Sequence, residues 1–301
     1  MNEEIAGRET TSCDMAARNE EIRRNLKNKK RIVVKVGTST ITHTQTGRLD
    51  LIKLEKFIRI LTDLRNQGKE IVLVSSGAIS VGRVALGLQE KPKERKIKQA
   101  CAAIGQSRLM MVYQKLFSEY NQLTAQILMT KFTIVNDISR HNAENTFREL
   151  LDMGVIPIVN ENDTVATDEI DVGDNDSLSA IVAAIIHADL LVLLSDIDGL
   201  YTDDPRRNPN AVLVPYVEEI TDEQMAMAKD SSTIYGTGGM SSKLGAAGIA
   251  NDAGADMLII NGEKITNLTK VLQGREMGTL FKAHKTKHFH LKNYLDGGSS
   301  R

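Results

Sequence analysis

Short runs of apolar residues alternate along this chain with longer segments in which apolar residues recur at helical spacing. The run Ile71–Val74 contains no polar residue, which is typical of parallel strands that are covered on both faces. Segment 51–66 instead places Leu, Ile or Phe every three or four residues and so predicts an amphipathic helix. Gly68 follows at the position expected of a glycine that ends a helix.

This alternation continues over most of the chain. The predicted strands are 31–36, 70–75, 125–130, 155–160, 190–195 and 257–261. The predicted helices are 51–66, 95–120, 139–153, 177–187 and 242–252. Strands linked by helices favour an α/β fold with a doubly wound, mostly parallel central sheet and helices on both faces.

Four of the predicted strands end in polar residues. These ends are 35–40 (KVGTST), 75–78 (SSGA), 160–163 (NEND) and 195–199 (SDIDG). In doubly wound sheets, ligands bind beyond the carboxyl ends of the strands. The four ends together therefore predict one ligand site above a single sheet.

The segments outside this alternation are predicted to be peripheral. Residues 1–30 are interpreted as a polar, solvated arm with a short helix at 19–26, residues 31–281 as the folded domain, and residues 282–301 as a basic tail. That tail carries four lysines and three histidines, and a solvated extension is favoured over a metal or phosphate patch. Segment 199–237 holds three of the five prolines and is predicted to form a lobe or lid over the edge of the sheet.

The composition and the net charge limit the kinds of partner that this protein is expected to bind. The 301 residues carry a formal net charge of −1, whereas a protein held mainly by phosphate backbones has a basic excess, so nucleic acid is disfavoured. No apolar stretch reaches the ~18 residues that span a bilayer, so no membrane segment is expected. Cys13 and Cys101 fit neither a metal spacing nor a disulfide framework, which favours a cytoplasmic protein.

Two lysines stand out chemically. Segment 236–243 (GTGGMSSK) opens a predicted helix, so its glycines and unpaired N–H groups suit close approach to a phosphate, with Lys243 adding a full charge. The competing interpretation is an ordinary glycine-rich loop with a solvated lysine. Lys35 lies within a predicted buried strand, where it needs either an anionic partner or a route for its ammonium group to water.

Two clusters rich in acids and amides complete the candidate chemistry. Segments 160–163 and 173–176 (GDND) lie at a strand end and before a helix, and one residue of Asp174, Asn175 and Asp176 is expected to cap that helix. Capping explains one residue but not both clusters. The remaining side chains suit an α-ammonium group, the orientation of lysines, or Mg²⁺. The sequence has neither a P-loop nor the GxGxxG fingerprint of dinucleotide-binding proteins.

These residues resemble the amino acid kinase family, and within it the group that phosphorylates glutamate. The segments that carry the resemblance are 34–39 (VKVGTS), 74–79 (VSSGAI), 103–108 (AIGQSR), 160–166 (NENDTVA), 172–176 (VGDND), 199–206 (GLYTDDPR) and 236–243 (GTGGMSSK). The pair NENDTVA and VGDND is the part specific to the glutamate group.

The resemblance implies ATP-dependent phosphorylation of the γ-carboxylate of L-glutamate, the first step of proline biosynthesis. It assigns Lys35 and Lys243 to the moving phosphoryl group and Asp176 to the orientation of both lysines. The residues implied to contact glutamate are Ser76, Asp163, Asp174 and Asn175. The residues implied on the ATP side are Lys35, Ser195, Asp196, Thr237, Gly238, Gly239, Met240, Ser241, Ser242 and Lys243.

The resemblance also implies partners. ATP is the expected co-substrate with Mg²⁺, for which no ligand residue is assigned, and L-proline is the expected feedback inhibitor. We further expect a homo-oligomer of unspecified size. Ser75 and Ser195 stand where other members have threonine, and a PUA domain follows the kinase domain in many bacterial members; the sequence leaves open whether such a domain was removed here.

Two alternatives remain at this point. One is a kinase of the same fold that acts on aspartate, N-acetylglutamate, carbamate or UMP, against which segments 160–166 and 172–176 argue. The other is a catalytically idle amino-acid-binding module, against which the presence of Lys35, Asp176 and Lys243 argues.

Overall fold

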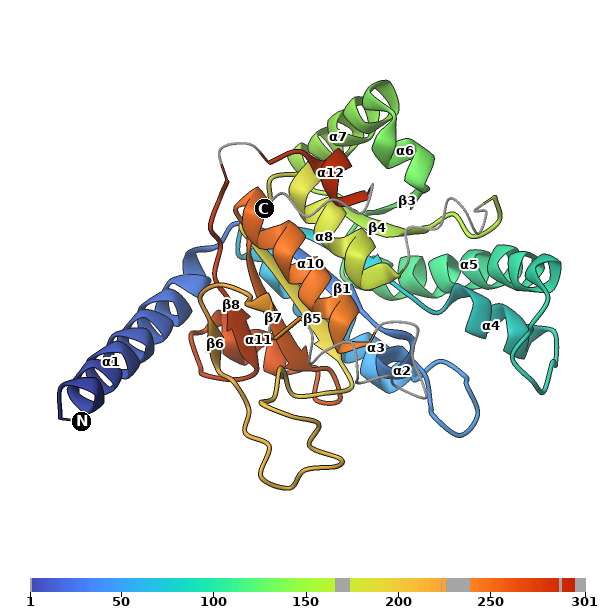
Figure 1. Ribbon diagram of the computed structural model, residues 1–301. Helices are drawn as coiled ribbons and strands as arrows, with labels where there is room; N and C mark the ends of the chain where they lie inside the picture. Colours follow the sequence, from blue (N-terminus) through green and yellow to red (C-terminus); the bar gives the residue numbers. More distant parts are fainter. Residues whose placement is uncertain (1, 166–173, 223, 226–238, 287–288, 296–301) are drawn as a thin grey trace.

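An eight-stranded sheet forms the centre of the computed structural model, which describes residues 2–165, 174–222, 224–225, 239–286 and 289–295 (Figure 1). The strands are β1 (Arg31–Val36), β2 (Glu70–Ser75), β3 (Thr124–Met129), β4 (Ile156–Glu161), β5 (Leu190–Ser195), β6 (Tyr216–Val217), β7 (Asp256–Asn261) and β8 (Thr279–Phe281). They lie in the order β3-β4-β2-β1-β5-β7-β8-β6.

The pairing is parallel throughout except between β7 and β8. The predicted mostly parallel α/β sheet is therefore confirmed, and each of the six predicted strands is present within one residue of its expected bounds. Strands β6 and β8 were not predicted, because two or three residues are too few to show a period.

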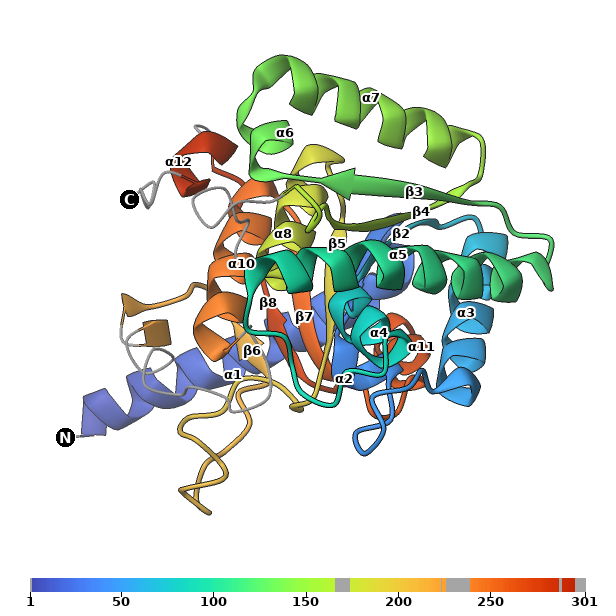
Figure 2. The ribbon, with the colours of Figure 1, turned by 90° about the vertical axis from the view of Figure 1, so that its right-hand side faces the viewer.

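Two layers of helices cover the sheet (Figures 1 and 2). The helices that pack on one face are α7 (Asp137–Asp152), α8 (Asn175–Ile185) and α10 (Met240–Ala253), and those on the other are α3 (Leu51–Asn66), α5 (Arg95–Ser118) and α11 (Asn267–Leu272). The side chains of β1 alternate accordingly, with Val33 in the first core and Ile32, Val34 and Val36 in the second.

The long helices follow the predicted ones, and α3 has the predicted bounds. Gly68 follows it with a φ of +84°, the left-handed conformation expected beyond a helix end. The short helices α2 (Thr38–Ile41), α4 (Ala78–Ala85), α6 (Lys131–Val135) and α12 (Leu291–Leu295) were not predicted. Each has eight residues or fewer, which is too short for an apolar stripe to repeat clearly at helical spacing.

The N-terminal arm differs from the prediction. It forms helix α1 (Asn2–Asn25), followed by the 3₁₀ turn η1 (Leu26–Asn28), and extends away from the body of the molecule in Figure 1. Its last turns are anchored rather than solvated: the guanidinium of Arg23 is buried and donates to the carbonyl oxygens of Pro215, Met277 and Gly278. The pattern of apolar residues did not predict this helix, because α1 is attached to the domain through a polar side chain, that of Arg23.

The C-terminal tail is also packed in the part that the structure describes. The His284 imidazole lies 2.9 Å from a carboxylate oxygen of Asp252, and Lys292 pairs with Asp137 at 2.8 Å. Phe289, Leu291 and Tyr294 pack against the core beneath α7, α8 and α10. In its described part, the tail is therefore not the solvated extension that was expected, because three of its apolar residues pack against the domain.

Segment 199–237 is described only up to residue 225, without residue 223. In that part, Tyr201 and Leu213 form an antiparallel bridge, and β6 adds a strand to the edge of the sheet. The segment thus contributes to the sheet itself. Its predicted function as a lid stays a prediction.

Helices α4 and α5 approach each other backbone to backbone. A Cβ atom added to Gly82 would lie 1.8 Å from the carbonyl oxygen of Cys101, and one added to Gly105 would lie 1.7 Å from that of Ala78. Neither distance is possible for real atoms, so only glycine fits at these two positions. Since α4 begins directly after the turn that follows β2, this crossing fixes α5 against that turn.

We expect Gly105→Ala to lower the free energy of unfolding by about 1–3 kcal/mol, because the added methyl group must push the two helices apart. The matched control is Gly248→Ala in α10, where an added Cβ meets nothing within 4 Å. This control should gain roughly 0.5–1 kcal/mol from helix propensity. Urea denaturation of both variants measures the difference, and equal shifts of the two midpoints would contradict the close crossing.

Candidate active site

The carboxylate of Asp176 lies between two lysine ammonium groups. Oδ1 is 2.6 Å from Nζ of Lys35, and Oδ2 is 3.0 Å from Nζ of Lys243. The exposed fractions of the three side chains are 2% for Asp176, 12% for Lys35 and 7% for Lys243. The structure therefore brings together the three residues to which catalytic roles were assigned from the sequence.

Each of these residues comes from a different element. Lys35 is the fifth residue of the central strand β1 and points to the same face as Val33, which α8 and α10 cover. Asp176 lies in the first turn of α8, and Lys243 lies in the first turn of α10. Because α8 and α10 pack side by side on that face, their N-terminal ends meet above the carboxyl end of β1.

The two lysines keep Asp176 ionised. Burial would raise the pKa of Asp176, but Lys35 and Lys243 outweigh this effect and hold its pKa below the ordinary value of 3.8. One ionised carboxylate is therefore shared by the ammonium groups of two lysines at the carboxyl end of β1. Two lysines gathered in one place suit an anionic ligand such as a phosphate.

The first turns of α8 and α10 are joined a second time. Asp174 is the N-cap of α8 and accepts a hydrogen bond from the backbone N–H of Ser177 at 2.9 Å. Its other carboxylate oxygen accepts from the hydroxyl of Ser242 in α10. Gly239, the N-cap of α10, offers no side-chain cap, so the first N–H groups of this helix are available to a ligand.

Toward β2 and β4, Asn175 is the centre of a polar cluster. Its Nδ2 donates to Oγ of Ser76 at 2.7 Å, to Oδ1 of Asn160 at 3.0 Å and to the carbonyl oxygen of Ser75 at 3.3 Å. The structure therefore also brings together Ser76 and Asn175, two of the four residues implied to contact glutamate.

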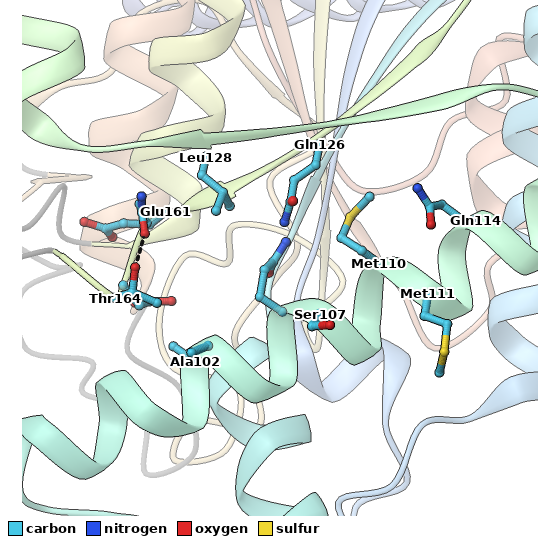
Figure 3. Close-up of a pocket in the computed structure, with 13 residues that line it drawn as sticks. Ala102, Ser107, Met110, Met111, Gln114, Gln126, Leu128, Glu161 and Thr164 are labelled. Atoms are coloured by element: carbon cyan, nitrogen blue, oxygen red, sulfur yellow. Dashed lines mark hydrogen bonds between the residues drawn. The ribbon is translucent and has the colours of Figure 1, made fainter.

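A cavity of about 570 Å³ lies beside this cluster, between α5 and the ends of β3 and β4 (Figure 3). Glu161 at the end of β4 and Asp163 just beyond it line the cavity, and Met110, Met111 and Gln114 line it from α5. Asp163, the third residue implied to contact glutamate, therefore faces a space large enough for an amino acid.

Two of the residues predicted on the ATP side, Ser195 and Asp196, lie on the far side of Lys35. Ser195 ends β5, and its hydroxyl donates to the Asp196 carboxylate at 3.2 Å. Because β1 lies between β2 and β5, the order along this edge of the sheet runs from Asp163 and Ser76 through Lys35 to Ser195. Thr237 and Gly238 lie outside the described residues.

Sequence reasoning missed two polar residues of α5. The side-chain oxygen of Gln106 accepts from Nδ2 of Asn160 at 3.0 Å, and the Tyr113 hydroxyl lies 2.8 Å from Oγ of Ser75. Burial raises the pKa of the Tyr113 hydroxyl far above its ordinary range. A signal was present, since the two residues are seven apart and thus share one face of a helix that is otherwise apolar there.

Within the described ranges, no group of three or more His, Cys, Asp and Glu side chains is arranged to hold a metal ion. In the same ranges, none of the helices has the length and the apolar character needed to cross a membrane.

The sequence pattern of the amino acid kinase family matches residues 30–261. The chain belongs to the amino acid kinase family. Among solved members of this fold, carbamate kinase from Giardia lamblia bound to AMP-PNP superposes with a TM-score of 0.60 at 15% identity, covering 85% of this chain and 99% of that one. Isopentenyl phosphate kinase from T. acidophilum gives 0.59 at 16%, covering 84% and 100%. These likenesses show the fold.

Curated relatives within the amino acid kinase family are much more similar. Glutamate 5-kinase of Carboxydothermus hydrogenoformans is 50% identical over 92% of this chain and 74% of its own length. The enzymes of the same name from Clostridium tetani and Clostridium perfringens are 51% and 48% identical, over 86% and 88% of this chain and 97% and 99% of theirs. The resemblance to the glutamate group of kinases, inferred from the motifs, is thereby confirmed.

We expect Asp176→Asn to lower the free energy of unfolding by about 3–5 kcal/mol near neutral pH, because it removes the buried carboxylate that pairs with both lysines. A carboxyl whose pKa is lowered on folding contributes stability above its unfolded pKa, and this is lost as pH falls through its folded pKa. The deficit should therefore shrink as pH falls below about 4. Denaturation at several pH values measures it.

The matched control is Asp137→Asn, which removes an exposed carboxylate that pairs with Arg140 and Lys292. It should shift the denaturation midpoint little, since exposed ion pairs contribute little to stability. A deficit of the same size in both variants, or one for Asp176→Asn that does not change with pH, would contradict the buried charge cluster.

Proposed function

We propose that this chain transfers the γ-phosphoryl group of ATP to the γ-carboxylate of L-glutamate, giving γ-glutamyl phosphate and ADP, the first step of proline biosynthesis. The observation that carries the proposal is the buried Asp176 carboxylate between Lys35 and Lys243, at the carboxyl end of the central strand. Relatives with 46–51% identity, all named glutamate 5-kinase, support the choice of acceptor.

The reaction asks for positioning and charge rather than for a general base. A γ-carboxylate is already ionised at neutral pH, so it can attack without losing a proton. The site must hold it in line with the γ-phosphorus and neutralise the charge that spreads over the equatorial oxygens. Lys35 and Lys243 supply two preformed positive charges, and Asp176 limits their mutual repulsion before ATP binds.

The two substrates would approach this centre from opposite sides. We assign glutamate to the side of β2 and β4, where Ser76, Asp163 and Asn175 lie. Asp174, at the N-cap of α8, is assigned to glutamate as well, although its carboxylate also contacts Ser242 of α10. We assign ATP to the side of β5 and α10. The assigned residues there are Ser195, Asp196, Gly239, Met240, Ser241 and Ser242, together with Thr237 and Gly238 in the glycine-rich segment. The uncapped first turn of α10 supports this assignment, since helix N-termini favour phosphate.

Mg²⁺ is proposed to arrive with ATP. Asp176 is already engaged by two lysines, which fits a cation that takes most of its ligands from phosphate and water. When bound, the ion would supply further neutralisation of phosphate charge. We propose no residue of this chain as its ligand.

With L-glutamate and Mg-ATP, the purified protein should form ADP, and hydroxylamine should trap the acyl phosphate as a hydroxamate. Lys243→Ala should lower kcat by about 10²–10³, as expected for the loss of one preformed positive charge in the transition state. A coupled ADP assay and a colorimetric hydroxamate assay measure the two products. Lys270→Ala, which removes an α11 lysine distant in sequence from the predicted motifs, is the control.

Two outcomes would contradict the proposal. Equal turnover with aspartate or N-acetylglutamate would reject glutamate as the specific acceptor. Full activity of Lys243→Ala would place phosphoryl transfer elsewhere.

L-Proline is proposed as a feedback inhibitor that competes with glutamate. Both molecules carry an α-carboxylate and an α-ammonium group, and proline lacks the γ-carboxylate that accepts phosphate, so it could fill the same pocket without reacting. If the two ligands exclude each other, saturating glutamate must relieve inhibition.

We also propose that the kinase is a cytoplasmic homo-oligomer.

Initial rates over a grid of proline and glutamate concentrations test this competition. We expect the proline concentration for half-inhibition to rise in proportion to glutamate once glutamate exceeds its KM. Inhibition that saturating glutamate leaves unchanged would place proline at another site, and no inhibition would reject the regulation.

A further inference from the structure

Two side chains on one face of α5 form hydrogen bonds to the residues that contact the Asn175 amide. Gln106 and Tyr113 are two helical turns apart on that face, and both are buried. Gln106 reaches Asn160 at the end of β4, and Tyr113 reaches Ser75 at the end of β2. These two strand-end residues are themselves hydrogen-bonded to Nδ2 of Asn175.

The bond from Gln106 determines which way the Asn160 amide is turned. Asn160 donates from Nδ2 to the Gln106 side-chain oxygen at 3.0 Å, and it accepts with Oδ1 from Asn175 at 3.0 Å. Without the acceptor on Gln106, Asn160 could turn over and present its NH₂ group to that of Asn175. Two facing donors cannot form a hydrogen bond, so the Asn175 amide would have to turn over as well.

The bond from Tyr113 acts on a second acceptor of the same amide. The Tyr113 hydroxyl holds Oγ of Ser75 at 2.8 Å, and the Ser75 carbonyl oxygen accepts from Asn175 at 3.3 Å. Ser75 also bears the turn that presents Ser76, whose Oγ is the shortest contact of Asn175 at 2.7 Å. Tyr113 therefore fixes the strand end from which two of the three acceptors project.

We propose that Gln106 and Tyr113 are positioning residues for the amino-acid substrate. By committing the NH₂ group of Asn175 to protein acceptors, they orient its carbonyl oxygen Oδ1 toward the substrate, where it accepts a hydrogen bond from the α-ammonium group. This inference rests on the proposed glutamate kinase activity. It adds to that activity two residues outside the strand-end and glycine-rich segments that contact the substrates.

The close crossing of α4 and α5 makes this support rigid. Gly105 precedes Gln106 and lies against the backbone of α4, and α4 starts from the turn that carries Ser76. A shift of α5 relative to that turn would require the two backbones to separate. The distance from Gln106 and Tyr113 to the strand ends is thus fixed by backbone contact rather than by flexible side chains.

Gln106→Met and Tyr113→Phe test the inference, because each keeps most of the side-chain volume and removes one hydrogen-bonding group. We expect KM for glutamate to rise about tenfold in Gln106→Met and about threefold in Tyr113→Phe, with KM for ATP within twofold of the wild type. The matched controls are Gln67→Met, at the exposed C-terminal end of α3, which removes a hydrogen bond to Asp63, and Tyr120→Phe just beyond α5. Both should keep wild-type KM values.

The outcomes separate this inference from the proposed function. Unchanged KM values in both Gln106→Met and Tyr113→Phe, or equal rises in KM for glutamate and ATP, would overturn the positioning role while leaving the kinase intact. Failure of the wild type to form a hydroxamate from glutamate would instead reject the proposed function. Should Gln106→Met not fold, Tyr113→Phe decides on its own.

Discussion

A carboxylate held between two ammonium groups away from water is the constraint on which the rest of the site depends. The Asp176 carboxylate can be buried in its ionised form because Lys35 and Lys243 lie within contact distance, and it is in turn a counter-charge for both lysines. The three groups come from β1, α8 and α10, so the positions of these elements are determined together. The packing of α8 on α10 thus has an electrostatic component as well as an apolar one.

That constraint also explains the layout of the remaining polar groups. Residues toward β2 and β4 form a cluster of amides and hydroxyls around Asn175, whereas residues toward α10 include the uncapped start of a helix. Neutral hydrogen-bonding groups suit an amino acid, and open N–H groups beside a lysine suit phosphates. Lys35 stands between the two environments because its strand is central.

Much of this arrangement could be predicted from the sequence, for reasons that differ from element to element. The unbroken apolar run of β5 and the helical apolar stripe of α3 are both patterns that can be recognised directly in the sequence. The strand ends bearing Lys35 and Ser76 could be placed near one another because parallel strands end at one edge. The sequence motifs at these strand ends indicated the amino acid kinase family.

Contacts made by polar residues between distant elements could not be predicted in this way. The anchoring of α1 through Arg23 leaves no periodic signal, and neither does the edge formed by β6 and β8. Gln106 was visible within a motif, yet only the structure shows that its side-chain oxygen meets Asn160. Such pairs depend on the tertiary arrangement, which a pattern along the chain does not contain.

The distribution of the charged centre over the chain has a consequence for folding. Lys35 belongs to the first strand, Asp176 to a helix in the middle, and Lys243 to the last long helix. Contacts between such distant segments close large loops and form late. During synthesis from the N-terminus, a chain that ends before α10 can pair Lys35 with Asp176 but lacks the second lysine. The charged centre is therefore complete only when α10 docks on the rest of the domain.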